Sequence, residues 1–393
     1  MNRWLFLWIL WCALSSCQAQ QEVVANVNVP TIKVGAEREI LYLPQLKGKK
    51  VAVVANATSM NGGVHLVDEL LAKGIQVAKV FAPEHGFRGD VPAGEKVNSS
   101  VDEKTGIAIV SLYGKHYQPT KEDLKGIDVV LFDIQDVGVR FYTYLSTLYY
   151  VMQACERDQV DLMVLDRPNP NASVVDGPVL DMSLKSMVGM LPIPILHGCT
   201  LGELALMTVG EEWGIGKDFA SRLTVIPVEN WNHNLPYSLP IPPSPNLRSD
   251  CAIHFYPSLC WFEGTSVSVG RGTEMAFETF GFPTLNHPDF YFTPQSIKGR
   301  VNHPPMEGMV CGGRALQSNC SGIAKLNMAY LLEAYENLGD SLFTSPQFFD
   351  KLAGTSNLRK QLQLGSSEEQ IRQTWKADLD RYKAIREKYL LYP

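Results

Sequence analysis

Short apolar runs rich in β-branched residues alternate with amphipathic segments over the first half of the chain, and this alternation limits the fold more than any other feature. The runs have the length and composition of buried strands, and the segments between them match helices. Strands that alternate with helices form right-handed βαβ units and a parallel sheet. The expected strands are 51–55, 77–81, 107–111, 129–132 and 162–165, and the expected helices are 64–73 and 141–158.

The chain has 393 residues, which is more than one hydrophobic core usually supports, so we expect two domains. Residues 46–250 are expected to form a Rossmann-like α/β domain with a parallel sheet. Residues 251–393 are expected to form an α+β accessory domain that makes the other wall of a cleft. Further expected elements are the helices 201–213, 325–338 and 368–389, the strand 223–228, and a β-rich stretch over 264–272.

The first 16 residues have the form of an export signal. Arg3 supplies a positive charge, and residues 4–14 are an apolar stretch too short to span a bilayer comfortably. The sequence Leu14-Ser15-Ser16-Cys17 resembles a lipobox, in which Cys17 is lipidated and residues 17–45 include the tether; an ordinary secretory peptide cleaved near Ala19 is the alternative. We therefore expect an exported lipoprotein, periplasmic or at the cell surface, held to the membrane by this anchor.

Charge and motifs argue against two kinds of partner. Once Arg3 is removed, 34 basic residues face 41 acidic ones, a net charge of −7, and no run rich in Lys or Arg suggests nucleic acid. The first strand turns through residues 56–63 without G-x-G-x-x-G, and no Walker A sequence is present, so we expect no nucleotide cofactor. Nor do we expect a metal, because His85, His197, His254 and His287 are scattered without ligand spacing.

The cysteines that follow Cys17 are Cys155, Cys199, Cys251, Cys260, Cys311 and Cys320. Export permits disulfides, and the separations of Cys251 from Cys260 and of Cys311 from Cys320 are typical of hairpins, but the sequence does not fix the pairing. Cys155 lies in an expected helix among apolar neighbours, so we expect a buried free thiol there.

Four of the first five expected strands end at a cluster of polar side chains. The carboxyl ends of parallel strands share one edge of a sheet, where open α/β sheets bind ligands. Such a cluster is costly to bury unless something polar occupies the site, so we expect a shared ligand site. The clusters are Asn56 and Thr58; Glu84, His85 and Arg88; Asp133, Gln135, Asp136 and Arg140; and Asp166, Arg167 and Asn169.

Each cluster taken alone also has a structural explanation. Asp133 could cap a helix, Arg140 could pair with Asp136, and Asp166 could hold the turn that follows it. Four clusters at the same edge of one sheet favour the site over four separate structural roles.

The residue types at this edge favour glycoside hydrolysis. No G-x-S-x-G elbow prepares a serine nucleophile. Glycoside hydrolysis needs a carboxylic acid that protonates the leaving oxygen, usually with a second group that activates water or attacks the sugar. Glu84, at a buried strand end, suits the acid. Arg88, Arg140 and Arg167 suit a carboxylate on the substrate, because a guanidinium binds one with two hydrogen bonds.

Nine short blocks carry a family resemblance, in the order Pro83-Glu-His-Gly-Phe-Arg-Gly89, Ala93-Gly-Glu-Lys96, Ser111-Leu-Tyr-Gly114, Phe132-Asp-Ile-Gln-Asp-Val-Gly-Val-Arg-Phe-Tyr-Thr-Tyr144, Asp166-Arg-Pro-Asn-Pro170, His197-Gly198, Pro243-Ser-Pro-Asn246, Phe262-Glu-Gly-Thr265 and Gly270-Arg-Gly-Thr273. In these blocks the chain resembles the NamZ-like exo-β-N-acetylmuramidases from about Lys49 to its C-terminus. The resemblance implies a Rossmann-like N-terminal domain whose active site lies in a cleft against a C-terminal accessory domain.

The resemblance also implies a glycosidase that releases terminal N-acetylmuramic acid from the non-reducing end of peptidoglycan fragments, with Glu84 as general acid. The lactyl ether of that sugar carries a carboxylate, which accounts for basic side chains at the site of an acidic protein.

We predict Glu84, Asp133 and Asp136 as catalytic residues, although Glu203 and Glu263 are also available as the second group. Glu203 follows Thr200 at capping-box spacing, so a structural role for it is equally open. The predicted substrate-binding residues are Asn56, His85, Arg88, Gln135, Arg140, Tyr142, Asp166, Arg167, Asn169, His197, Glu203, Asn246, Glu263 and Arg271.

Two other functions fit the same site. A lipid-anchored glycan-binding protein would use the cleft without turnover, but it would not need a protonatable acid at position 84. An amidase or esterase acting on cell-wall material would be another hydrolase on the same scaffold.

Overall fold

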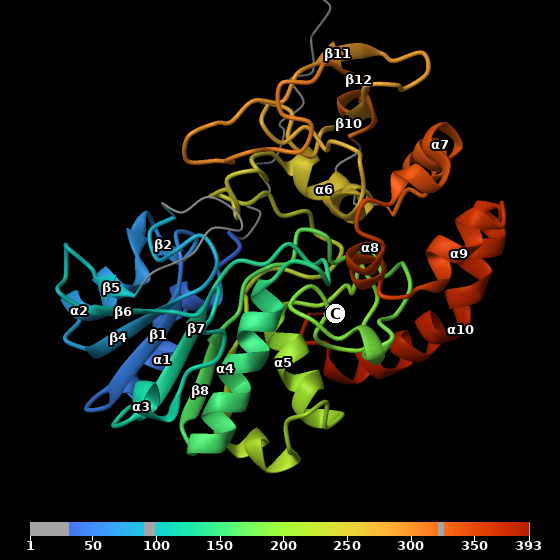
Figure 1. The fold of residues 1–393 in the computed structure, drawn as a ribbon. Coiled ribbons are helices and arrows are strands. Elements are labelled where there is room, and N and C mark those ends of the chain that lie inside the picture. Colours follow the sequence, from blue (N-terminus) through green and yellow to red (C-terminus); the bar gives the residue numbers. More distant parts are fainter. Residues whose placement is uncertain (1–30, 90–98, 321–325, 393) are drawn as a thin grey trace, which may run out of the picture. The chain divides into compact units, whose positions relative to one another are not determined.

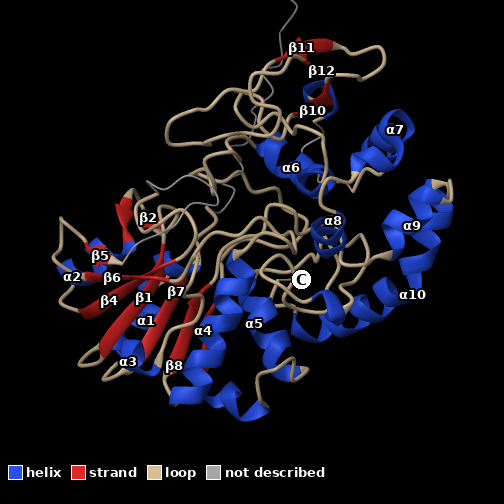
Figure 2. Cartoon of the chain, in the orientation of Figure 1, coloured by secondary structure: helices blue, strands red, loops and turns tan. Residues whose placement is uncertain are grey.

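Residues 50–226 contain a mostly parallel sheet, as the alternating pattern predicts (Figures 1 and 2). The computed structural model describes residues 31–89, 99–320 and 326–392. Within these residues the sheet has seven strands, of which the short edge strand β5 alone runs antiparallel to its neighbour. In spatial order they are β5 (Ser100–Val101), β6 (Ala108–Ser111), β4 (Gln76–Ala82), β1 (Lys50–Ala55), β7 (Val129–Asp133), β8 (Asp161–Leu165) and β9 (Leu223–Ile226).

The strand order sets where a ligand can bind. From β1 the chain continues to β4 and β6 on one side, and it then crosses back to β7, β8 and β9 on the other. The order therefore reverses between β1 and β7, and the crevice outside the carboxyl ends at such a reversal is the usual ligand site of open α/β sheets. The segments that carry Asn56, Glu84 and Gln135 all leave the sheet at this edge.

Both faces of the sheet are buried, because alternate residues of each strand enter different cores. In β1, Ala52 and Val54 pack into the core that includes α4 (Tyr144–Asp158) and α5 (Leu201–Gly210). Val51, Val53 and Ala55 pack with α1 (Glu39–Leu46) and α2 (Leu66–Ala72) on the other face. This layered α/β arrangement confirms the predicted fold class.

The other regular elements include two small sheets and six further α-helices among the described residues. A two-stranded hairpin and a three-stranded antiparallel sheet, in the order β10-β12-β11, accompany the main sheet. The strands are β2 (Met60–Asn61), β3 (Val64–His65), β10 (Thr279–Phe282), β11 (Phe290–Phe292) and β12 (Cys311–Ala315). The other helices are α3 (Lys121–Leu124), α6 (Asp250–Leu259), α7 (Ala329–Leu338), α8 (Pro346–Ala353), α9 (Asn357–Gln363) and α10 (Glu368–Arg386).

Two elements differ from expectation for local reasons. The helix predicted from residue 141 begins at Tyr144, because the preceding residues pair with another segment: Arg140 donates its backbone N–H to Ile195 O at 2.8 Å. The stretch 264–272 holds no regular strand. It turns at Gly270 and Gly272, whose φ angles of 76° and 83° lie in the left-handed region that favours glycine.

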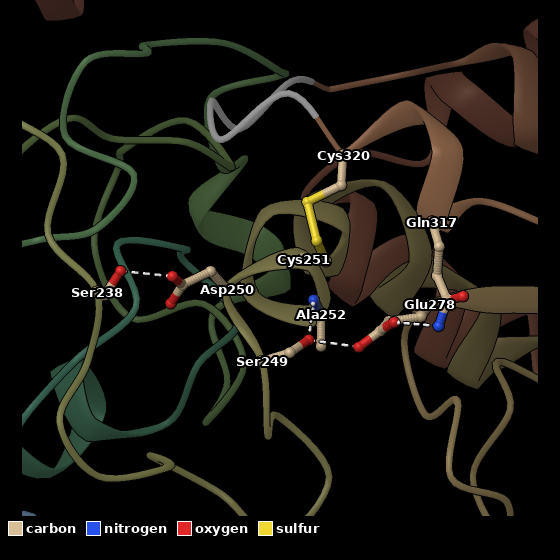
Figure 3. The surroundings of a disulfide bond; sticks show 8 residues. All are labelled: Ser238, Ser249, Asp250, Cys251, Ala252, Glu278, Gln317 and Cys320. Atoms are coloured by element: carbon tan, nitrogen blue, oxygen red, sulfur yellow. Dashed lines mark hydrogen bonds between the residues drawn. A yellow bond between two sulfur atoms is a disulfide. The ribbon is translucent and has the colours of Figure 1, made fainter.

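One disulfide joins Cys251, in the first turn of α6, to Cys320, which follows β12 (Figure 3). The hairpin-like pairings suggested by sequence separation are therefore wrong, and Cys260 and Cys311 are buried free thiols. Cys155 is a buried free thiol, as predicted. Near the bridge, Ser249 donates to Glu278, which also accepts a hydrogen bond from Gln317, so polar contacts join the same two segments (Figure 3).

The chain from Ile32 onward forms one compact unit, and the boundary predicted at residues 250–251 stays a prediction. The export signal and Cys17 lie outside the described residues, so their roles also stay predictions. None of the described helices combines the length and the apolar composition that crossing a bilayer requires.

Candidate active site

A cavity of about 430 Å³ lies at the carboxyl ends of β4 and β6. Several stretches of chain, distant in the sequence, form its walls. Glu84 and Tyr113 come from the loops that follow these two strands, whereas Tyr256, Glu263 and Arg271 come from α6 and the residues after it. Side chains from both predicted domains therefore meet around one space.

A second cavity, of about 250 Å³, adjoins the first. The two share His85, Tyr144 and Ser244 in their linings. Asn56 and Thr58, at the end of β1, line the second cavity, which places it beside the reversal of strand order. One extended ligand could therefore contact both spaces.

Glu84 is half-buried, and two hydroxyl groups hold its carboxyl group. Tyr113 donates to Oε1 at 3.0 Å and Thr143 donates to Oε2 at 2.7 Å. A hydroxyl group can both donate and accept, so the same partners can hold a carboxylate or a carboxylic acid. The arrangement suits a group that must gain and lose a proton without moving.

The turn after Glu84 has an unusual backbone. His85 adopts φ 72° and Gly86 adopts φ 77°, so two consecutive residues lie in the left-handed region. A non-glycine residue there costs on the order of 1 kcal/mol, and such residues cluster at functional sites. The tight turn directs Glu84 and His85 into the same cavity.

Glu263 lies in the lining of the same cavity and is held by Arg271. Nε and Nη2 of Arg271 both donate to Glu263 Oε1, at 3.0 and 2.5 Å. The guanidinium group also lies over the ring of Phe277, 5.0 Å from its centroid. Arg271 is the residue between the two left-handed glycines, so the turn that replaces the predicted β-rich stretch presents this side chain.

Glu263 alone among the four acidic candidates for the second catalytic group shares the cavity of Glu84. Asp133 is fully buried at the end of β7, and its oxygens accept from Arg167 Nε at 2.6 Å and Nη2 at 2.9 Å. Asp136 is buried and accepts from the backbone N–H of Gly138 at 2.7 Å. Neither Asp133 nor Asp136 lines the cavity of Glu84, and the catalytic roles predicted for them stay predictions.

Glu203 forms the predicted capping box at the start of α5. It accepts from the backbone N–H of Thr200 at 2.9 Å, and its own N–H donates to the Thr200 hydroxyl at 3.2 Å. The carboxyl group also contacts His233 Nε2 at 2.9 Å and accepts from Leu391 N at 2.8 Å. The structural explanation of Glu203 thus holds, and the residue does not line the cavity.

Asp166 anchors the same end of α5 to the C-terminal segment. It accepts from the Thr200 hydroxyl at 2.6 Å, from Gly202 N at 2.9 Å and from the Tyr392 hydroxyl at 2.6 Å. Burial raises the pKa of this carboxyl group to about 6, although the three donors oppose that rise. The carboxyl group of Asp166 thus has a structural role, but these three donors lie in distant segments and not in the turn that follows it.

The three arginines predicted to bind a substrate carboxylate all have protein partners. Arg88 donates to Asp102 with Nε and Nη2, both at 2.8 Å, and it lowers the pKa of that carboxyl group to about 2. Arg167 pairs with Asp133. Arg140 pairs with no aspartate among the described residues: it is fully buried and donates to the backbone oxygens of Pro178, Ile193 and Leu352 at 2.6–3.0 Å.

Some of the other predicted site residues line a cavity, and the rest are buried and hold the surrounding backbone. Tyr142 lines the first cavity and donates to Pro243 O at 2.7 Å. Asn246 is buried and donates to Arg300 O at 3.2 Å. Three other residues are buried and support the site. Gln135 donates to Asp136 O and Pro168 O, and Asn169 donates to Cys199 O. The pKa of His197 falls to about 3 because burial disfavours its charged form.

Sequence reasoning assigned no role to several lining residues. Tyr113 follows β6 as Glu84 follows β4, so the rule about strand ends would have found it. Thr143 stands next to the predicted residue Tyr142 in the longest of the matching blocks. Tyr256 lies within α6 and shows no local signal, because its contact with the site depends on how distant parts of the chain pack.

Fold and site together define a class: α/β proteins of Rossmann-like layout with two carboxylates around one cavity at the carboxyl edge of the sheet. Two family models match the chain, the N-terminal model of the exo-β-N-acetylmuramidase NamZ over residues 51–250 and the C-terminal model over residues 254–392. The peptidoglycan β-N-acetylmuramidase NamZ of Bacillus subtilis is 36% identical over 379 residues, which cover 89% of each chain. The chain belongs to the NamZ exo-β-N-acetylmuramidase family.

Two solved structures share the fold, and both are DUF1343 family proteins of Bacteroides fragilis. One is 45% identical, with a TM-score of 0.83 over 92% of this chain and 99% of the other. The second is 27% identical, with a TM-score of 0.79 over 93% of this chain and 100% of the other.

Proposed function

We propose that the protein is an exo-acting glycosidase that releases β-linked N-acetylmuramic acid from the non-reducing end of peptidoglycan fragments, with Glu84 as general acid. The observation that carries the proposal is the pair of carboxyl groups, Glu84 and Glu263, in one cavity at the carboxyl edge of the sheet. Family membership and the name of the Bacillus subtilis relative support the substrate and the reaction.

The residues divide the reaction between them. Glu84 donates its proton to the glycosidic oxygen as the bond from that oxygen to the anomeric carbon breaks. Tyr113 and Thr143 keep the carboxyl group in place before and after the transfer. Glu263, whose negative charge Arg271 stabilises, faces the positive charge that develops on the sugar. The anomer released first distinguishes whether Glu263 attacks the sugar or activates water.

The Glu84→Gln variant tests the acid. We expect it to lower kcat/KM roughly 100- to 10,000-fold on a muramic acid disaccharide, because the leaving sugar oxygen then receives no proton from the enzyme. The loss should be smaller on the para-nitrophenyl β-glycoside, whose leaving group needs little protonation. Sugar release by chromatography and nitrophenol absorbance give the two values. The exposed Glu122→Gln variant is the matched control.

Equal losses on both substrates would contradict the acid role of Glu84 and would leave a general positioning role. Turnover of neither substrate by the wild-type protein, with tight binding of the sugar, would instead favour the glycan-binding alternative. Cleavage that depends on an amide or ester, and not on the glycosidic bond, would favour the other hydrolase.

The Glu263→Gln variant tests the second carboxylate. We expect a similar loss of roughly 100-fold or more on both substrates, because stabilisation of the developing charge does not depend on the leaving group. Azide added to this variant should restore turnover if Glu263 attacks the sugar or activates water. Unchanged kinetics would exclude Glu263 from the reaction and leave the role of Glu84 intact.

A further inference from the structure

We propose that Arg248 and Arg300 form an anion-binding subsite in the second cavity, and that this subsite holds the carboxylate of the substrate while Glu84 acts in the first. The inference rests on the proposed function, which it deepens by naming the residues that recognise the acidic substituent of the sugar. Both arginines line the second cavity.

The two cavities adjoin, because part of their lining is common to both. They share His85, Tyr144 and Ser244, and His85 is the residue next to Glu84. We infer that a sugar bound at Glu84 directs a substituent past His85 into the second cavity, which Arg248 also lines. The lactyl ether of a muramic acid residue is a substituent of that kind.

The charge of the second cavity favours an anion. Its lining includes two guanidinium groups, and no acidic side chain is among its described lining residues. Arg248 is exposed and has no hydrogen-bond partner among the described residues, although its charge interacts with that of Glu274. Arg300 donates through Nη1 to Glu274 at 2.8 Å, but the Glu274 side chain is 77% exposed and lies outside the lining.

The wall that carries these arginines is fixed to the active site. Pro243, at the start of the wall, accepts hydrogen bonds from the hydroxyl groups of Tyr142 at 2.7 Å and Tyr144 at 3.3 Å. The buried Asn246 donates its side-chain amide to Arg300 O at 3.2 Å, which joins the segment before Arg248 to the segment of Arg300. The subsite is thus built into ordered backbone, whereas each guanidinium group keeps donors for a ligand.

The other arginines near the site are less suitable. Arg88, Arg140 and Arg167 are engaged with protein partners, and none of them lines either of the two cavities. Arg271 lines the first cavity, but Glu263 neutralises its charge there. Arg248 and Arg300 therefore offer the positive charge that the sequence assigned to other positions.

The test measures kcat/KM of the full-length protein on three para-nitrophenyl β-glycosides: N-acetylmuramic acid, its lactyl methylamide, and the lactyl-L-alanine conjugate, which moves the carboxylate onto an attached amino acid. Arg248→Gln and Arg300→Gln should each lower kcat/KM about 10-fold or more on the free acid, since each variant loses a hydrogen bond between two charged groups. Neither variant should change kcat/KM on the methylamide. Arg381→Gln, a highly exposed arginine on α10, is the control.

The pattern across substrates identifies the source of the carboxylate. A loss on the free acid alone assigns the subsite to the lactyl group, and a loss on the alanine conjugate alone assigns it to an attached peptide. Rising salt should weaken the preference of the wild-type protein for the free acid, and should have no such effect in the double variant. Equal losses on all three substrates, or no loss on any, would overturn the subsite.

Binding separates this inference from the proposed function. Calorimetry with free N-acetylmuramic acid measures affinity whether or not the protein hydrolyses the glycosides. Absence of turnover together with binding that depends on Arg248 would overturn the proposed function and uphold the subsite. Normal turnover with unchanged preference and affinity in the variants would uphold the function and overturn the subsite.

Discussion

Asp136 is a buried acidic residue whose pKa depends on its surroundings in the fold. Its carboxyl group is buried, and one of its oxygens, Oδ2, has no hydrogen-bond partner among the described residues. Burial raises the pKa of this group to about 7, although hydrogen bonds from the backbone N–H groups of Gly138 and Val137 oppose the rise. The folded protein therefore keeps a proton on Asp136 over a range of pH in which the unfolded chain has lost it.

This pKa difference predicts a pH dependence of stability. The folded state binds the extra proton between the unfolded pKa near 4 and the folded pKa near 7, so stability falls as pH rises through that window, by up to about 1.4 kcal/mol per pH unit. Asp136→Asn keeps an acceptor for Gly138 and removes the titration. Urea unfolding at pH 4.5 and 7.5 should therefore show that the variant gains stability relative to the wild type as pH rises. The exposed Asp218→Asn variant is the control, and its stability relative to the wild type should be the same at both pH values. The same result for Asp136→Asn would contradict the predicted pH dependence.

Among single residues, the sequence predicts a site residue well when its side chain enters the cavity at the end of its own strand. Glu84 could be found because it follows a buried strand closely, at the edge of the sheet where ligands bind. Asp133 and Arg167 carry the same signal, yet they pair with each other 34 residues apart and leave the cavity to other groups. Whether two such residues face a ligand or one another depends on tertiary packing, which the local sequence does not encode.

At the element scale, the disulfide joins α6 to the segment after β12 across 69 residues of chain. Closing a loop of that length in the unfolded state contributes about 4 kcal/mol in the chain-entropy model. The double variant Cys251→Ser/Cys320→Ser should therefore unfold at a lower guanidinium concentration than the oxidised wild type. Reductant should lower the wild-type midpoint and leave that of the variant unchanged. Equal midpoints for the variant and the oxidised wild type would show that the bridge does not stabilise the fold.

Some elements could be predicted because local sequence determines them, whereas others depend on tertiary packing. The first five expected strands, which are β1, β4, β6, β7 and β8, lie within a residue or two of their predicted positions. A run of β-branched residues between turns determines a buried strand almost alone. The stretch 264–272 contains similar residues but pairs with no neighbour as a regular strand. Its two left-handed glycines were visible in the sequence, but their conformations were not, and those conformations turn the chain to present Arg271.

At the scale of the whole molecule, we propose that Cys17 anchors the protein in a membrane after export. The lipobox and the preceding apolar stretch support this, and the disulfide suits an oxidising compartment. In cells that carry the natural signal, Cys17→Ser should move the protein from the membrane fraction to the soluble exported fraction and abolish labelling by a fatty acid. Glycosidase activity per molecule should stay unchanged. Membrane retention of the variant without label would contradict the anchor.

The contact of Tyr392 with Asp166 limits how the chain can be divided. The two residues lie 226 positions apart, and Leu391 also contacts Glu203 at the same end of α5. The two family models meet between residues 250 and 254, yet a fragment that ends there would leave both carboxyl groups at the base of the helix without these donors. We therefore expect the N-terminal half expressed alone to be less stable than the same residues within the full chain, because the C-terminal segment completes the hydrogen bonding at the start of α5.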